Sequence, residues 1–239
     1  MKRFVIAIGL LASALPVAGW SQQNAVSEGN MEVIVTAQRR DADDYSSDTP
    51  AVGLIRKADF AVVTVTVMGD SRDRLQRQDE IYAMVRGAIE AAPRAGVELA
   101  YGSRTLEPLT MANYKELSLR NDSRPDSQRV TFLVKVPLSG TDAKTAQQRI
   151  TSYVKSVRPV GRALMEQSGE MQLSIVAPDQ YRGAVADLII ADATKMGEKL
   201  GPDYTIEIEG LHRPVEWVRA GLSDVMIFIP YRLVVGRRR

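Results

Sequence analysis

The sequence predicts an α+β fold in which helices pack on a mainly antiparallel sheet, preceded by a flexible N-terminal linker. Between residues 58 and 236, runs with apolar residues at every second position alternate with runs at helical spacing. The strand-like runs alternate apolar with polar residues, which indicates one buried face on each strand. Helices covering one face of an antiparallel sheet fit this pattern better than a doubly wound parallel sheet does.

The first 21 residues have the features of a secretory signal peptide. Lys2 and Arg3 precede an apolar run over residues 4–18, which small residues close. This run is shorter than the roughly 20 residues that a transmembrane helix needs. We expect cleavage after Ser21, or alternatively after Gly19, and export to the periplasm, with association with the outer membrane as a further alternative.

The composition narrows the classes of function. The chain has 31 basic and 29 acidic residues, and loss of Lys2 and Arg3 with the signal peptide leaves them balanced. A nucleic-acid partner is therefore not expected, because such proteins carry a clustered basic face. The basic residues 237–239 are interpreted as a solubilising tail that makes at most peripheral contact with a membrane.

The counts of cysteine and histidine limit the chemistry further. There is no cysteine and one histidine, His212. The sequence therefore has no disulfide, no thiol nucleophile, no thiolate metal site and no metal site built from several histidines. We expect no catalytic residue, no metal and no cofactor in this chain.

Residues 22–57 are predicted to be a flexible linker, because polar residues dominate and periodic apolar positions are few. One ordered segment, residues 31–40, is expected within it. Residues 41–44 read Asp-Ala-Asp-Asp. They are interpreted as part of a solvated linker, since a calcium loop needs more ligands in a fixed register.

The first half of the domain is expected to contain a strand, a helix and a second strand. Residues 60–68 alternate β-branched residues, which predicts a strand with one buried face. A helix should follow, capped by Asp70 or Ser71 and running to Ala92, where Pro93 ends it. Residues 97–108 are predicted to form the next strand.

The second half is expected to follow with two helices and four strands. The polar stretch 113–128 is predicted to be a loop and residues 158–168 are ambiguous. The expected elements are a strand over 130–136, a cap at 139–142, a helix over 145–157, strands over 171–176 and 204–209, a helix over 178–200 ended by Gly201, and a last strand over 224–235. Pro230 cannot donate to a ladder, so this last strand is expected at an edge or bulged.

Three stretches of residues 58–235 resemble the SIMPL-domain family of exported bacterial proteins. They are the early strand at 58–67 with the following helix and Gly-Val-Glu-Leu at 96–99, the late helix at 184–201, and the closing strand Val-Met-Ile-Phe-Ile-Pro-Tyr-Arg-Leu at 225–233. The resemblance implies a periplasmic or envelope α+β protein that is often oligomeric. Residues 58–236 are expected to form this domain, and a division into two subdomains is the alternative. The resemblance also implies no established enzymatic activity. We therefore expect a non-enzymatic envelope protein that acts through protein–protein contacts or oligomerisation.

The segment 31–40 resembles the TonB box of outer-membrane receptors, which binds TonB by adding a strand to a sheet edge. Its candidate partner-binding residues are Glu32, Val33, Ile34, Val35, Thr36 and Ala37. The resemblance implies, as an alternative function, an accessory protein that binds the TonB periplasmic domain in energy-coupled uptake. The other interpretation is an extra strand over 31–37, paired within this fold or with a neighbouring subunit.

A second alternative is a periplasmic hydrolase or small-ligand binder. His212 follows Gly210-Leu211 and is interpreted as a surface-loop histidine, since no G-x-S-x-G motif accompanies it. No glycine-rich phosphate loop occurs either. Asp187 and Asp192 are interpreted as solvated or capping charges, and Trp217 as a loop anchor. This alternative requires polar and acidic residues to converge in a pocket of the folded chain.

Overall fold

The computed structural model describes residues 32–35, 52–103, 105–122 and 124–238, and for residues 33–35 it describes the backbone alone. Every strand pairing in this part of the chain is antiparallel, so the predicted α+β class is confirmed. The elements, in order, are β1 Glu32–Val35, β2 Leu54–Lys57, β3 Phe60–Gly69, α1 Arg74–Ala95, β4 Glu98–Tyr101, β5 Thr105–Pro108, η1 Tyr114–Glu116, β6 Arg120–Asn121, β7 Gln128–Pro137, α2 Ala143–Ser156, β8 Leu164–Gln167, β9 Gln172–Val176, η2 Pro178–Tyr181, α3 Arg182–Leu200, β10 Tyr204–Glu209, β11 Glu216–Arg219, β12 Asp224–Phe228 and β13 Arg232–Arg237. The predicted signal peptide lies outside the described residues.

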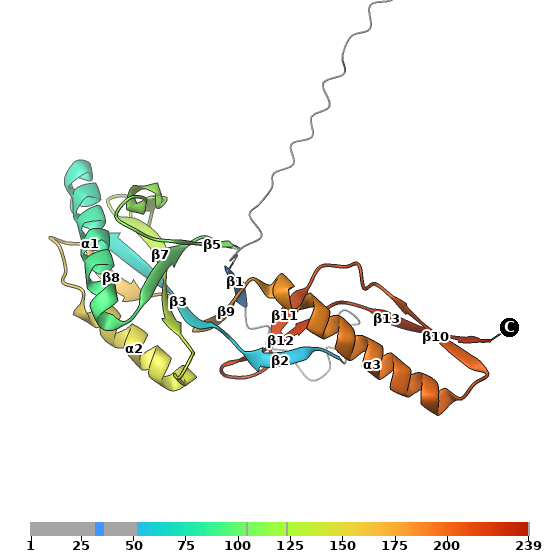
Figure 1. Cartoon of the computed structure of the whole chain (residues 1–239). Coiled ribbons are helices and arrows are strands. Elements are labelled where there is room, and N and C mark those ends of the chain that lie inside the picture. Colours follow the sequence, from blue (N-terminus) through green and yellow to red (C-terminus); the bar gives the residue numbers. More distant parts are fainter. Residues whose placement is uncertain (1–31, 36–51, 104, 123, 239) are drawn as a thin grey trace, which may run out of the picture.

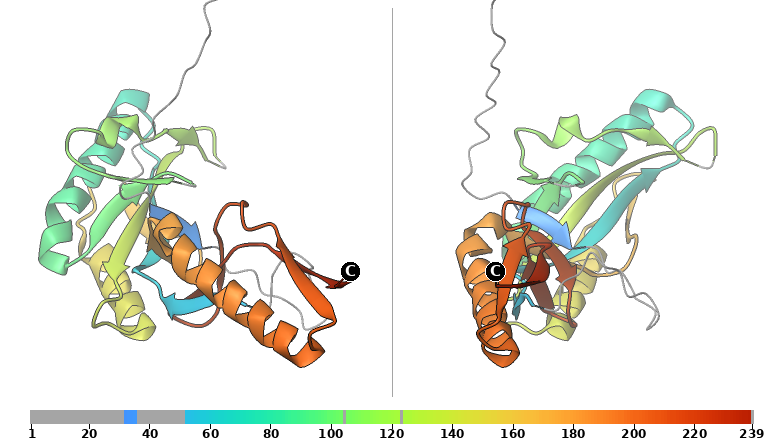
Figure 2. Two further views of the ribbon diagram at one scale, coloured as in Figure 1. Left: turned by 45° about the vertical axis from the view of Figure 1, so that its right-hand side comes forward. Right: turned by 90° about the vertical axis from the view of Figure 1, so that its right-hand side faces the viewer.

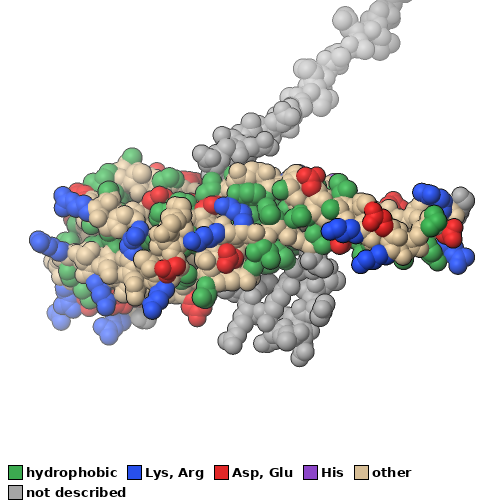
Figure 3. Space-filling view, turned by 60° about the horizontal axis from the view of Figure 1, so that its bottom comes forward, with side chains coloured by type: hydrophobic (Ala, Val, Ile, Leu, Met, Phe, Trp, Pro, Cys, Tyr) green, Lys and Arg blue, Asp and Glu red, His purple; other side chains and the backbone are tan. Residues whose placement is uncertain are grey.

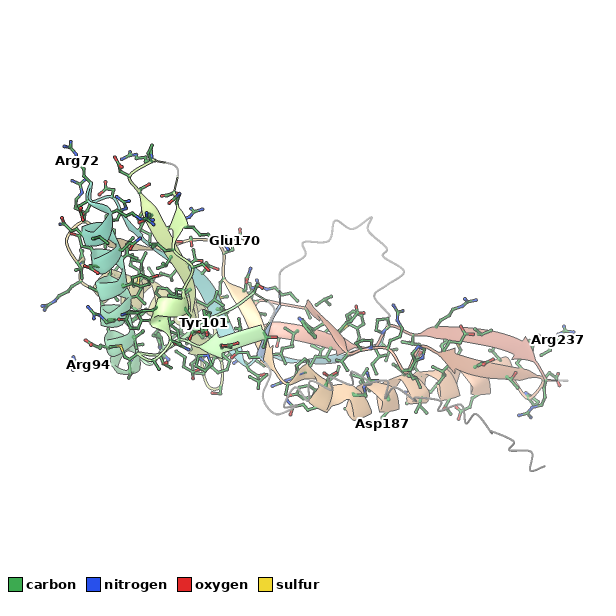
Figure 4. The ribbon with its side chains drawn as sticks, turned by 90° about the horizontal axis from the view of Figure 1, so that it is seen from above. Arg72, Arg94, Tyr101, Glu170, Asp187 and Arg237 are labelled. Atoms are coloured by element: carbon green, nitrogen blue, oxygen red, sulfur yellow. The ribbon has the colours of Figure 1, made fainter. Side chains whose placement is uncertain are left out.

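The chain forms two lobes, which give it an elongated outline (Figure 1). The body consists of β1 and residues 60–176, with α1 and α2 beside the largest sheet. The arm consists of β2 and residues 178–237, and α3 runs along its length (Figure 2). Figure 4 shows Arg72 at one end of the molecule and Arg237 at the tip of the arm.

The main core of the body lies between the sheet and its two helices. Ten consecutive residues of β3 pair with β7, from Phe60 to Gly69. Alternate residues of β3, such as Val63 and Val65, are fully buried against α1 and α2, which contribute Ile81 and Ile150. The predicted buried face with Val63 and Val65 is confirmed and is the face that the helices cover. The prediction of a single buried face is wrong, because Val62 and Thr66 on the other face are buried inside the body as well.

Helix α1 begins and ends at other residues than the sequence pattern predicted. Asp73 is the N-cap, and its carboxylate accepts a hydrogen bond of 2.8 Å from the Gln76 N–H. The helix continues through Pro93 and ends at Gly96, whose φ of 63° is left-handed. Pro93 removes one main-chain donor only one turn before the end, and the amides of Gly96 and Val97 satisfy the last carbonyls instead.

The single strand predicted over 97–108 is wrong, because these residues form a tight hairpin of β4 and β5. Gly102 has a φ of 122°, and a Cβ atom there would lie 2.1 Å from the Thr105 carbonyl oxygen. Only glycine allows this close approach, so the chain reverses there. The loop predicted over 113–128 also contains η1 and the short strand β6, and the ambiguous residues 158–168 contain β8.

Six strands of the body close into a ring. β3 pairs with β7, β7 with β4, β4 with β5, β5 with β1, β1 with β9, and β9 pairs back with β3. β1 pairs on both sides, through two residues with β5 and four residues with β9. β1 is therefore the strand that closes the ring, and the other five strands come from residues 60–176.

The arm differs from the prediction in three strands. Residues 54–57, placed in the linker by the sequence pattern, form β2, which pairs with β12. Residues 216–219 form β11, which the prediction missed. The strand predicted over 224–235 is two strands, since Pro230 lies between β12 and β13 and these belong to different sheets. Arg237, predicted in the basic tail, is the last residue of β13 and lies opposite Tyr204.

Helix α3 packs through a narrow stripe. Val185, Ile189 and Ala193 are buried, whereas Leu188 is 40% exposed and Met196 is 38% exposed. The apolar face predicted for this helix is thus only partly covered by the described residues. No helix in the described part of the chain has the length and apolar character that crossing a membrane requires.

Candidate functional site

The ring has an interior that the strand registers define. In an antiparallel pair, residues directly opposite each other point to the same side of the sheet. The registers place Lys135 opposite both Val62 and Glu98, Leu106 opposite Glu32, and Phe60 opposite Ser174. This side is the one away from α1 and α2, and its apolar members Val62, Ala100, Leu106 and Leu133 form a small separate core with Phe60.

A buried ion pair lies in this interior. The Lys135 ammonium contacts a Glu32 carboxylate oxygen, and both side chains are less than a tenth exposed. The Ser174 hydroxyl, which is fully buried, donates a hydrogen bond to the other Glu32 oxygen. β1 therefore brings its carboxylate to a cation and a hydroxyl that β7 and β9 hold in place.

Two further groups complete the surroundings of Lys135. Its ammonium lies 3.4 Å from the Glu98 carboxylate, which is 57% exposed, and 4.0 Å from the centre of the Phe60 ring. Attraction between an ammonium and an aromatic face adds to that of a carboxylate. The buried cation is thus partnered by a buried carboxylate, an exposed carboxylate and an aromatic ring, and Glu32 is the partner that β1 supplies.

A cavity of about 500 Å³ adjoins the ion pair. The ring strands contribute Glu32, Lys135, residues 98–100 of β4 and residues 106–108 of β5 to its lining, and α1, Val97 and residues 109–111 supply the rest. Beside it, the Tyr101 hydroxyl lies 2.8 Å from Glu107 and 3.1 Å from Glu116, and the bond to Glu107 is the largest cause that raises the pKa of Tyr101 to about 12. Acidic and polar residues therefore converge in a pocket, as the small-ligand alternative requires, although Glu32 and Lys135 already satisfy each other.

The structure places four of the predicted partner-binding residues in β1. Glu32, Val33, Ile34 and Val35 form an ordinary antiparallel strand between β5 and β9, so this strand pairs within the fold. Thr36 and Ala37 lie outside the described residues. Nothing in the sequence pattern indicated Lys135 or Ser174, because their importance depends on strands far apart in the chain.

A second polar cluster lies where the body joins the arm. Asp59, between β2 and β3, accepts a 2.8 Å hydrogen bond from the Val176 N–H and forms an ion pair with Arg56 at 2.7 Å. The Arg56 guanidinium also contacts the Tyr181 hydroxyl and lies 4.6 Å from the centre of that ring. Next to this cluster, Ala177 has a φ of 46°, a left-handed conformation that costs a non-glycine residue about 1 kcal/mol. The Asp59 carboxylate thus holds together two of the segments through which the chain passes between the body and the arm.

The remaining residues singled out in the sequence do not gather into a site. His212 is exposed in a turn, and Asp187 is exposed on α3 (Figure 4). Asp192 is half-buried and raises the pKa of Tyr231, for which burial is the larger cause. Trp217 is half-buried in β11 and packs against the core. Among the described residues, no three acidic or histidine side chains form a metal-binding group.

Comparison with known proteins gives no relative: no family model, no curated protein and no solved structure matches this chain. The class is therefore defined by the fold and the site alone. It is a two-lobed α+β protein whose body contains a strand ring closed by an N-terminal strand, with a buried ion pair at the point of closure.

Proposed function

We propose that this chain is a non-enzymatic, SIMPL-like protein of the periplasm that acts by binding other copies of itself through the arm. The observation that carries the proposal is the apolar surface of the arm. Leu188, Ile190 and Met196 on α3 and Val235 on β13 are each between 38% and 48% exposed. Figure 3 shows hydrophobic side chains gathered along the middle of the molecule, where the arm begins, whereas charged side chains predominate toward its tip.

The sheet edges of the arm support the same proposal. β10 and β13 form a sheet of two strands, so within the described residues their outer edges have no strand partner. Packing of α3 on β10 stabilises this two-stranded sheet, but its open edges remain templates for pairing with another chain. Contact between copies would cover both the apolar side chains and these edges.

The test is the molar mass of the mature protein, measured by light scattering at micromolar concentrations. We expect an oligomer for the natural chain and its dissociation in the variant Met196→Asp/Val235→Asp. Leu75→Asp is the matched control, because Leu75 is 71% exposed on α1 in the body. A natural chain that stays monomeric, or a control that dissociates as the arm variant does, would overturn the proposal.

A second candidate is the TonB-interacting accessory protein, and the extended backbone of β1 favours it. A segment that docks by strand addition must be extended and able to leave its resting place. A photoreactive side chain at position 34 in intact cells tests this candidate directly. A product with TonB supports it, whereas a product with this chain alone refutes it.

A further inference from the structure

The ring holds a strand that is separable from the rest of the body. β3, β4, β5, β7 and β9 come from one continuous stretch, whereas β1 is joined to that stretch only through β2 in the arm. No described element precedes β1. Withdrawal of β1 therefore breaks two ladders and the ion pair of Glu32, and it requires no other described element to move.

The groove that β1 fills persists without it. β5 is paired with β4 on its other side, and β9 is paired with β3. Both edges of the groove are thereby held, and each would present unpaired main-chain donors and acceptors if β1 left. Such an edge pair binds an extended segment through main-chain hydrogen bonds, and side-chain pockets give the specificity.

The groove also specifies the chemistry of its occupant. Lys135 and Ser174 are buried, and both direct polar hydrogens to the Glu32 carboxylate. A neutral segment in the groove would cover Lys135 again without giving it a close carboxylate, which is strongly unfavourable. The occupant must therefore be an extended strand with a carboxylate at the position of Glu32.

We propose that this groove is a strand-acceptor site, and that in the assembled protein it takes residues 32–35 of a second copy of this chain. A second copy carries the same residues 32–35 that fill this groove in the structure. Exchange between copies therefore preserves every contact of β1. Residues 36–53 separate β1 from β2. Eighteen residues can span roughly 60 Å when extended, which is long enough to reach a neighbouring body.

The chain is well suited to a disulfide test, since it contains no cysteine. Val33 and Thr105 are opposite residues of β1 and β5. Opposite residues of antiparallel strands have Cα atoms about 4.5–5.5 Å apart, which is within the range that a disulfide bridges. The variants Val33→Cys and Thr105→Cys are made in full chains of different tag length, mixed, refolded together and oxidised.

The expected result is a disulfide-linked heterodimer on a non-reducing gel, with the 33–105 linkage confirmed by mass spectrometry. Adding Glu32→Ala to the Val33→Cys chain should lower its yield at least tenfold. Leu222→Cys, at a 77% exposed loop position, replaces Thr105→Cys as the control and should give no heterodimer with Val33→Cys.

The double variant Val33→Cys/Thr105→Cys decides the alternative. An internal disulfide in a monomer, together with no heterodimer from the mixed single variants, shows that β1 stays in its own ring and overturns the proposal. Absence of both products shows that the groove does not hold β1 in this register, and this overturns it too. The proposal does not rest on the arm: Met196→Asp/Val235→Asp should lower the molar mass of the untrapped protein, but it should leave a 33–105 linkage already trapped by oxidation, so the two proposals can fail separately.

Discussion

Removal of the Glu32 carboxylate should destabilise the protein far more than a surface change. In Glu32→Ala, Lys135 loses its close carboxylate and Ser174 loses its acceptor, both in the buried interior of the ring. Breaking one side of a buried ion pair costs about 3–5 kcal/mol. The Glu98 carboxylate, 3.4 Å from the Lys135 ammonium, remains and compensates for part of this loss, although it is exposed. The expected loss of stability is therefore near the lower limit, about 3 kcal/mol.

The assay is urea unfolding of the mature protein, and Glu32→Met, Lys135→Met and the double variant Glu32→Met/Lys135→Met form a double-mutant cycle beside Glu32→Ala. The double variant should lie within about 1 kcal/mol of the natural chain, because two apolar side chains leave no unpaired charge. A loss below about 0.5 kcal/mol for Glu32→Ala, or a double variant equal to the sum of the single ones, would refute the reasoning. Hydrogen exchange should show the amides of β9 losing protection first.

Three further outcomes are expected. Arg162 holds the pKa of Asp70 below its usual value of 3.8, and the Ser71 hydroxyl lowers that of Glu80. Both carboxylates therefore stabilise the folded protein at neutral pH, and this stabilisation is lost as the pH falls through their lowered pKa values. In acid unfolding curves, Asp70→Asn should lose less stability between neutral and acid pH than the natural chain does. Gly161→Ala should destabilise the protein by about 1–2 kcal/mol in thermal melts, because φ is +56° and a Cβ would lie 2.3 Å from the Glu80 carboxyl. Gly87→Ala is the control at a helix position with open space, and it should stabilise the protein by about 0.5–1 kcal/mol. Tyr153→Phe should cost about 1 kcal/mol, because its buried hydroxyl donates a 2.7 Å hydrogen bond to a carbonyl of α1; an unchanged melting temperature would contradict this.

Regular, strongly periodic elements were predictable from the sequence. The helix-facing side of β3 and the cap residue Asp142 of α2 are local signals, and the structure confirms both, with Asp142 accepting a 2.8 Å bond from the Thr145 N–H. The burial of the other side of β3 depends on the closed ring and was not predicted. Short elements were not predictable in this way. β2 has only four residues, and its order comes from pairing with β12, which lies some 170 residues further along the chain.

The candidate site was half predictable. The segment around Glu32 was recognised from its run of strand-forming residues near the N-terminus. Its receptor was not, because Lys135 on β7 and Ser174 on β9 each look like an ordinary polar residue in an alternating strand. They become a site only when the ring closes and places them on the same interior side.

The sequence by itself determined the α+β class, because period-2 and period-3.6 patterns are local and set by which face each element buries. It also determined the charge balance and the lack of cysteine chemistry. Only the tertiary structure decided that β1 closes a ring, that Gly102 turns a predicted strand into a hairpin, and that Pro230 divides the last strand between two sheets. The physical reason is that strand pairing joins residues far apart in the chain, so no local pattern records which edges meet.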